Sequence, residues 1–355
     1  LNTTNGSLTF PGIFEHPTIE AGALTGDVYW TRQNGQPIVT FERIHVVNAD
    51  ADVSAQGTWR ADPAAGPAGV ADITGTIARA QAASVWKYMP LVIGKPVRDW
   101  LQNGLVSGTA QNGTFEIRGP FKGFPWVKDP KSGRFYVGAD VVNAAIDYVP
   151  DRVSKKKGAL WPLLTDINGR IAFEGLSMRV EADRAKTFGV DVGKTTAVIA
   201  NLAGGSSTLL DIDGDAQGSL QRMFDYVEAS PVGGFIGHAF KSTRAEGEAQ
   251  LSLALDIPLL HAKDTRVSGA VTMSGNHVEM PRPIPPLAEV QGTVRFNEKG
   301  ASAQRVLAKP FGKEDSTVNV ITAQDGTISV TASGSIDVAD IGWFADTPIV
   351  RTLLK

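Results

Sequence analysis

Apolar and polar residues alternate along most of this chain, and no other feature of the sequence limits its fold as strongly. The run from Leu176 to Asp183 alternates without a fault, and the same pattern returns at 169–174, 250–257, 292–297 and 326–331. A two-residue period places successive side chains on opposite faces of a strand, so each strand has one apolar and one polar face. The long apolar runs typical of buried parallel sheets are missing. The chain is therefore predicted to be mainly β, with antiparallel strands.

Short turn signals separate the alternating runs. Asn or Asp followed by Gly favours a tight hairpin turn, because both residues tolerate a positive φ. Such pairs occur at Asn112-Gly113, Asp213-Gly214 and Asp325-Gly326, and Glu174-Gly175 is a related signal. Each pair is predicted to be a turn between two strands.

Three segments interrupt the alternation, namely 78–103, 219–240 and 337–354. Each is predicted to form a corner of two short helices, the second beginning at a proline, which suits the first turn of a helix. These prolines are Pro96, Pro231 and Pro348. Ser230 and Thr347 directly precede two of them and are predicted helix N-caps.

The same elements recur at a regular distance. Gly26, Gly169 and Gly292 occupy equivalent positions in three similar segments, 143 and 123 residues apart, and the three corner prolines are 135 and 117 residues apart. Agreement between independent markers indicates an internal repeat of strands plus a helical corner. The predicted units are a partial first repeat at 1–104, a complete middle repeat at 105–243 and a third repeat at 244–355.

Composition excludes several functions. The 355 residues include no Cys, so disulfides, thiolate metal sites and a Cys nucleophile are excluded. The 34 Lys and Arg against 37 Asp and Glu leave a net charge of −3, without the basic excess of a nucleic-acid-binding surface. The five His are scattered without metal-ligand spacing, and no catalytic motif is recognisable. We therefore predict neither an enzyme nor a metal or cofactor site.

Alternation alone leaves two architectures open. A repeat chain grows in one direction, each unit packing mainly on its neighbours. Its strands can close into a sandwich whose apolar face is filled by side chains. They can equally curl into a long trough whose apolar face stays open, since both arrangements need one dry face.

Several motifs carry a resemblance to a known family. The last unit contains the runs LALDIPL from Leu253, TRVSGAV from Thr265 and PPLAEVQGTVRF from Pro285, and the middle unit contains WPLLTDINGR from Trp161. In these motifs the chain resembles the AsmA-like envelope proteins, specifically the YhdP branch, which is related to TamB. The resemblance covers about residues 76–335 well and the first 75 more loosely, and it is a resemblance to an internal fragment of such a protein.

The resemblance implies a fold and a role. It implies a curled, taco-like antiparallel sheet with a hydrophobic groove, and bridge-like transfer of phospholipids from the inner to the outer membrane of the Gram-negative envelope. Phospholipid acyl chains are then the bound partners, and both membranes are reached through parts of the protein outside this chain. The implied location is the periplasm, as part of an inner-membrane-anchored protein. The family brings no catalytic residues, cofactor or nucleic acid.

Inward-facing residues of the alternating strands would line such a groove. The predicted lining residues are Phe115, Ile117, Phe135, Val137, Ile171, Phe173, Leu176, Met178, Val180, Leu251, Leu253, Leu255, Val271, Met273, Val294, Phe296, Ile328 and Val330. The same residues would instead fill a closed core if the chain were a periplasmic scaffold that aids assembly of the outer envelope. A carbohydrate-active repeat protein, with facing carboxylates in a cleft, is a third and more distant alternative.

Overall fold

The computed structural model describes residues 1–150, 160–323, 328–335 and 337–344. Its 18 strands form one open, curled antiparallel sheet. The strands of the first half are β1 (Asn2–Thr9), β2 (Thr18–Gln33), β3 (Gln36–Val47), β4 (Ala51–Asp62), β5 (Gly66–Gln81), β6 (Leu105–Pro120), β7 (Arg134–Ile146), β8 (Leu164–Glu174) and β9 (Ser177–Thr187). The second half comprises β10 (Val190–Ile199), β11 (Leu209–Ser219), β12 (Arg244–Glu246), β13 (Glu248–Pro258), β14 (Arg266–Glu279), β15 (Leu287–Asn297), β16 (Gly300–Pro310), β17 (Ser316–Thr322) and β18 (Ile328–Gly334).

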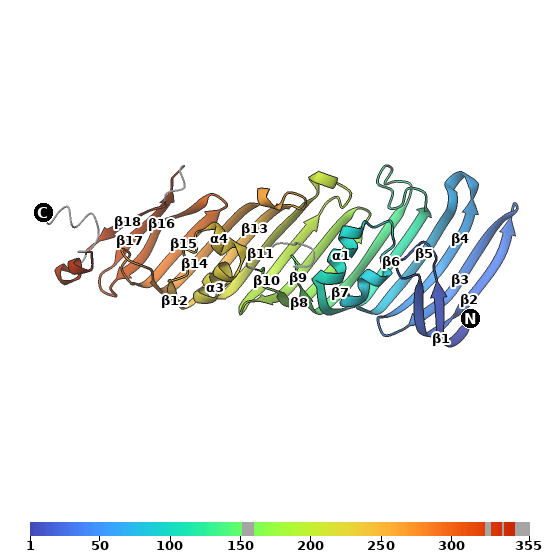
Figure 1. The fold of residues 1–355 in the computed structure, drawn as a ribbon, viewed down its shortest axis with the longest axis horizontal. Coiled ribbons are helices and arrows are strands. Elements are labelled where there is room, and N and C mark those ends of the chain that lie inside the picture. Colours follow the sequence, from blue (N-terminus) through green and yellow to red (C-terminus); the bar gives the residue numbers. More distant parts are fainter. Residues whose placement is uncertain (151–159, 324–327, 336, 345–355) are drawn as a thin grey trace.

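The strands follow one another across the sheet in chain order. Each pairs antiparallel with its successor, except that β11 pairs with β13, while the short β12 pairs with β14. The result is a row of tilted strands running from the N-terminal end of the molecule to the C-terminal end (Figure 1). Strands β1 and β18 are the two edges of the described sheet. The mainly β, antiparallel fold predicted from alternation is confirmed.

Bulges keep the apolar side chains on one face over long strands. Asn112, Asn143 and Arg305 have φ values of 52°, 50° and 56°, and the pairing register shifts at each of them. A bulge inserts one residue, which turns the following side chains to the opposite face and increases the local twist. Strands of up to 16 residues therefore keep a single apolar face, although the alternation of apolar and polar residues shifts by one position within them.

Two of the predicted turns are wrong. Asn112-Gly113 lies inside β6, where Asn112 forms a bulge, and Asp213-Gly214 lies inside β11. Both pairs have the local chemistry of a turn, but the neighbouring strands supply hydrogen-bond partners on both sides and the chain stays extended. Glu174-Gly175 does connect β8 to β9, with φ of 56° at Gly175. Asp325-Gly326 lies outside the described residues.

Two helical corners form as predicted. The first contains the 3-10 helix η2 (Ala82–Tyr88) and helix α1 (Lys95–Gly104), with Pro96 in the first turn. The second contains α3 (Leu220–Ala229) and α4 (Pro231–Phe235). Ser230 caps α4, because its hydroxyl accepts a hydrogen bond from the Val232 N–H at 3.2 Å.

The third corner is described only in part. A 3-10 helix, η5 (Val338–Phe344), follows β18. Thr347, Pro348 and the predicted second helix lie outside the described residues. Three further 3-10 helices are single turns in loops, η1 (Pro63–Ala65), η3 (Gly205–Ser207) and η4 (Ala262–Asp264). Helices α1, α3 and α4 lie on the same side of the sheet (Figure 1).

The main buried cluster lies where α3 meets the sheet. Leu220 and Met223 of α3 pack with Ala249, Met273 and other buried residues of β10 and β12–β17. A smaller cluster is centred on Ala144, Ile167 and Ala185 in β7, β8 and β9. The corner therefore covers one end of the strands, and the core is a strip along that end.

We expect the cap of α4 to contribute measurably to the stability of the second corner. Ser230 is fully buried, and its hydroxyl also donates to the Val227 carbonyl oxygen at 2.9 Å. Ser230→Ala should lower the free energy of unfolding by about 1 kcal/mol, as other cap deletions do. Urea unfolding followed by circular dichroism measures this change. The exposed strand residue Ser268 is the matched control, and Ser268→Ala should stay within about 0.5 kcal/mol of the parent; equal effects of the two variants would contradict the assignment.

Candidate functional site: the apolar face of the sheet

Strand pairing joins the apolar residues into rows that cross the sheet. Residues directly opposite each other in antiparallel strands share a face. One row reads Gly75, Phe115, Val137, Phe173, Met178 and Ile199 from β5 to β10. Another reads Ala216, Leu251, Val271, Val294, Ala303, Val320 and Val330 from β11 to β18. We call the face that carries these rows the apolar face.

The structure brings together nearly all of the residues predicted from alternation. Seventeen of the 18 occupy apolar-face positions by their register, and the exception is Leu176. Leu176 lies in the turn between β8 and β9, where its carbonyl oxygen accepts from the Leu202 N–H at 2.8 Å. Ile328 begins β18, two positions before Val330, and pairs with Thr322. The role of these 18 residues in binding a ligand stays a prediction.

Most of these side chains are half-buried, and this exposure distinguishes an open face from a closed core. Of the described residues, only 21 apolar ones are buried, in a chain that is 42% hydrophobic. The accessible surface of the chain is 21243 Å², whereas a compact monomer of this mass exposes roughly 13,800 Å². Even fully extended, the residues outside the described ranges would add at most roughly 4,000 Å². The described sheet therefore does not form a compact globule with a full second layer, and most of the predicted lining residues stay half-exposed.

Both ends of the strands are partly covered. At the end that carries the corners, Met273 is buried beneath α3. At the opposite end, the loop between β6 and β7 folds onto the sheet, and the Phe124 ring lies 5.4 Å from the Phe135 ring. Trp126 of that loop is 3% exposed and donates from Nε1 to the Pro120 carbonyl oxygen at 2.7 Å. Phe135 is therefore shielded, and the open part of the face runs along the middle of the strands.

Some residues of the apolar face were not predicted from the sequence, because they lie in strands whose alternation is interrupted or flanked by acidic residues. Ile212 directly precedes Asp213-Gly214, which we predicted to be a turn. The segment is instead the middle of β11, and Ile212 pairs with Leu255. Val39 and Trp30, also on this face, pair in β3 and β2. Alternation around Ile212 was the available signal, because each neighbouring Asp points to the other face.

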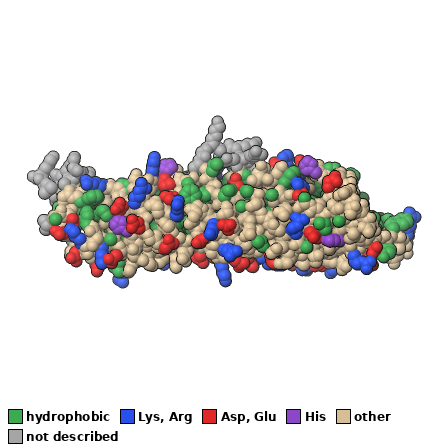
Figure 2. Space-filling view, turned by 90° about the horizontal axis from the view of Figure 1, so that it is seen from below, with side chains coloured by type: hydrophobic (Ala, Val, Ile, Leu, Met, Phe, Trp, Pro, Cys, Tyr) green, Lys and Arg blue, Asp and Glu red, His purple; other side chains and the backbone are tan. Residues whose placement is uncertain are grey.

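The outer face of the sheet is polar and balanced in charge. A network of ion pairs crosses β5 to β8. Arg118 pairs with Asp72 at 3.1 Å and also with Glu116. Arg134 pairs with Glu116 at 2.8 Å and also with Glu174. Seen edge-on, acidic and basic side chains are interspersed along the elongated molecule (Figure 2). Exposed pairs add little stability, so their main effect is to keep this face hydrated and to oppose sheet-on-sheet aggregation.

A carboxylate holds the first corner against the sheet. Asp50, in the turn between β3 and β4, accepts hydrogen bonds from Ser84 Oγ at 2.8 Å, Lys87 Nζ at 2.9 Å and Tyr88 Oη at 3.1 Å. Partial burial alone would raise the pKa of the Asp50 carboxyl, but the hydrogen bonds, above all those from Lys87 and Ser84, outweigh it and hold this pKa below its usual value. Helix η2 is thus fixed by an ionised group.

Two tyrosines connect the first corner to the second. Trp100 of α1 donates from Nε1 to the Tyr148 carbonyl oxygen at 3.1 Å, and the hydroxyls of Tyr148 and Tyr226 lie 2.8 Å apart. Tyr226 belongs to α3. Burial raises the pKa of both phenols, so the pair stays neutral and hydrogen-bonded near pH 7. The two corners are therefore linked to each other at the end of the strands that carries them.

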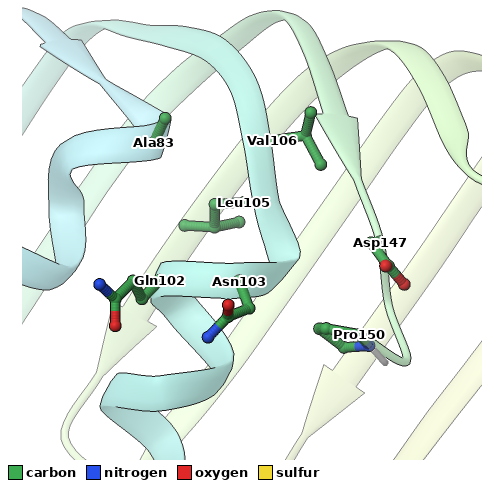
Figure 3. A pocket seen from close by; sticks show the side chains of 7 residues that line it. All are labelled: Ala83, Gln102, Asn103, Leu105, Val106, Asp147 and Pro150. Atoms are coloured by element: carbon green, nitrogen blue, oxygen red, sulfur yellow. The ribbon is translucent and has the colours of Figure 1, made fainter. Parts of the chain in front are cut away.

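One pocket lies beside the first corner. A cavity of about 450 Å³ lies between the end of α1 and strands β6 and β7 (Figure 3), lined by Ala83, Gln102, Asn103, Leu105, Val106, Asp147 and Pro150. Asp147 is the only titratable residue among these seven. No group of three His, Asp or Glu within the described ranges could hold a metal ion. None of the described helices has the length and apolarity needed to cross a bilayer.

Comparison with known proteins identifies the family. The model of the YhdP protein family matches residues 1–353. The chain belongs to the YhdP family. A curated relative, the intermembrane phospholipid transporter YhdP of Escherichia coli (strain K12), is 25% identical over 232 residues, which cover 65% of this chain and 17% of that protein. This chain thus corresponds to a small part of the length of its YhdP relative. No solved structure matches it.

The Asp50 anchor predicts a pH dependence. An ionised Asp50 stabilises the corner at pH values above the unfolded-state pKa of about 4, and this contribution is lost as the pH falls through the lower folded-state pKa. Asp50→Asn should lower the free energy of unfolding at pH 7 by roughly 1–2 kcal/mol. It should also make stability less sensitive to acid below pH 4 than in the parent.

Urea unfolding at pH 7 and between pH 4 and pH 2.5 tests both expectations. Asp213→Asn, on the exposed outer face of β11, is the matched control and should stay within about 0.5 kcal/mol of the parent at pH 7. An Asp50→Asn variant as stable as the parent at neutral pH would show that the carboxylate does not anchor η2.

Proposed function

We propose that this chain is a segment of a non-enzymatic phospholipid conduit, in which acyl chains travel along the apolar face between the inner and outer membranes. The observation that carries the proposal is the row of half-buried apolar side chains that continues from strand to strand across the described sheet. We infer that the curled sheet turns this face inward, so that it forms the wall of a groove. A protein with a closed core would instead cover this face with a second layer of helices or strands.

The energetics suit a sliding ligand. Each acyl CH₂ exposed to water costs ~0.8 kcal/mol, so a lipid leaving a bilayer needs an apolar surface along its whole path. Side chains such as Phe173, Val180, Leu253 and Val294 supply that surface without polar anchors that would hold the chain in one place. Phospholipid headgroups would stay in water at the mouth of the groove.

The relative supports the cargo and the location. The E. coli protein is named as an intermembrane phospholipid transporter, and membership of the YhdP family extends this expectation to the present chain. We infer that the segment works in the periplasm, as part of an inner-membrane-anchored protein, and that other parts of that protein reach the two membranes. A scaffold with a closed core is less well supported, because such a core would bury Leu253, Leu255 and Val271, which are half-exposed here.

A charge on the apolar face tests the conduit. Leu253→Asp places a carboxylate in the middle of the face, where an acyl chain would have to pass it at a desolvation cost of several kcal/mol. The purified variant should lose at least ten-fold in phospholipid retained after incubation with vesicles of dioleoylphosphatidylglycerol, measured by native mass spectrometry and lipid extraction. Circular dichroism should show unchanged strand content, because Leu253 is only half-buried.

The neighbouring residue provides the control. Ser252 is exposed on the outer face of the same strand, so Ser252→Asp adds the same charge without touching the groove and should retain lipid as the parent does. Equal retention by folded Leu253→Asp and Ser252→Asp proteins would rule out transport along the apolar face.

A further inference from the structure

Two phenylalanines on the apolar face lie directly opposite glycines. Gly269 in β14 pairs with Phe296 in β15, and Gly75 in β5 pairs with Phe115 in β6. The two pairs are eight strands apart along the sheet, because β11 pairs directly with β13. In both, a large aromatic side chain faces a position without any side chain.

The rings occupy the space above the glycines. A Cβ atom built on Gly269 would lie 2.1 Å from Phe296 Cζ and 2.6 Å from both Cε atoms, and no other atoms come as near. On Gly75 it would lie 2.3 Å from Phe115 Cζ and 2.4 Å from its Cε1. The far end of each ring therefore rests on the backbone of the next strand, so the ring lies flat on the sheet instead of standing up from it.

The backbone itself does not require glycine at these positions. Neither Gly75 nor Gly269 has a left-handed φ. Glycine in a strand interior is less favourable than alanine by roughly 0.5–1 kcal/mol, and its presence there often marks a close approach of a ligand or a neighbouring group. The ring is the group that needs the space in this case.

We propose that Gly269 and Gly75 set the depth of the groove floor, and thereby determine how bulky an acyl chain the groove admits. This inference rests on the proposed function, since it concerns the same groove. A flat ring raises the floor by about one carbon layer, ~3.5–4.0 Å. A side chain at the glycine would force the ring off the sheet and into the path of the lipid. Straight chains would be hindered moderately, and chains with methyl branches strongly.

Gly269 is the better position for a test. At Gly75 an added Cβ would also meet the Ser54 carbonyl oxygen at 2.3 Å, so its substitution would disturb the backbone as well. At Gly269 the nearest obstacles are all atoms of the Phe296 ring, which can rotate away. Gly269→Ala should therefore move a ring and leave the strands in place.

The experiment compares two probe lipids of different chain width. Parent and variant proteins are incubated with vesicles of dioleoylphosphatidylglycerol or diphytanoylphosphatidylglycerol, and bound lipid is counted by native mass spectrometry. Gly269→Ala should lower the ratio of branched to straight-chain lipid bound at least five-fold. Removing the ring in Gly269→Ala/Phe296→Ala should restore the ratio to the parent value or above it. A merely structural role of Gly269 would lower binding of both lipids equally and would not be rescued.

An outer-face glycine supplies the matched control. A Cβ on Gly138 would lie 2.3 Å from the Tyr136 hydroxyl oxygen, so Gly138→Ala displaces a ring by a similar clash on the opposite side of the sheet. Gly138 pairs with Ala172, whereas its neighbour Val137 pairs with Phe173 on the apolar face. Gly138→Ala should leave the lipid ratio unchanged.

Three outcomes would overturn the proposal, and they can be told apart. A folded Gly269→Ala protein with the parent's ratio would show that the ring does not limit the groove. The single variant Phe296→Ala needs no new side chain at Gly269, so it tests the proposal even if Gly269→Ala fails to fold. A lower ratio of branched to straight-chain lipid in Phe296→Ala than in the parent would also contradict the proposal. Absence of either lipid from the parent protein would instead refute the conduit, and the groove-depth proposal with it.

Discussion

Pairing between consecutive strands is the interaction on which the rest of this structure depends. Apart from the short β12, each strand is hydrogen-bonded to its neighbours in chain order, and the described part of the chain buries few apolar residues. Cross-strand side-chain contacts, such as Ile171 with Val180 and Val271 with Val294, therefore contribute much of the stabilisation. A molecule of this kind can be lengthened strand by strand without enlarging a central core.

The same pairing produces an unusual surface. Because opposite residues share a face, alternation in each strand becomes a continuous apolar face over the whole row, and bulges at Asn112 and Arg305 preserve its phase. The second corner adds a buried strip at one end of the strands through Leu220 and Met223, and it is linked to the first corner through Tyr148 and Tyr226. Large exposed apolar areas on a stable protein are typical of binding surfaces, and the shape of this one suits a long apolar ligand better than a compact one.

The sequence predicted much of this architecture because its signals are local and repeated. Alternation placed Phe173, Val180 and Leu253 on one face, and Pro96 and Pro231 marked helices α1 and α4. Turn chemistry was the weaker guide: Asn112-Gly113 and Asp213-Gly214 favour turns, yet partner strands on both sides hold them extended. The covering of Met273 by α3 and of Phe135 by Phe124 depends on contacts between segments far apart in the sequence. Alternation of apolar and polar residues predicts neither these contacts nor the flat rings over Gly75 and Gly269.

Site-specific photo-crosslinking along one strand tests the central claim most directly. A photoreactive residue is placed in turn at positions 251 to 256 of β13, and the protein is irradiated with a radiolabelled phospholipid. The open-groove account predicts labelling with a period of two, at positions 251, 253 and 255 and not at 252, 254 and 256, because alternate side chains point to opposite faces. Labelling without this period, or no labelling at any of the six positions, would contradict it.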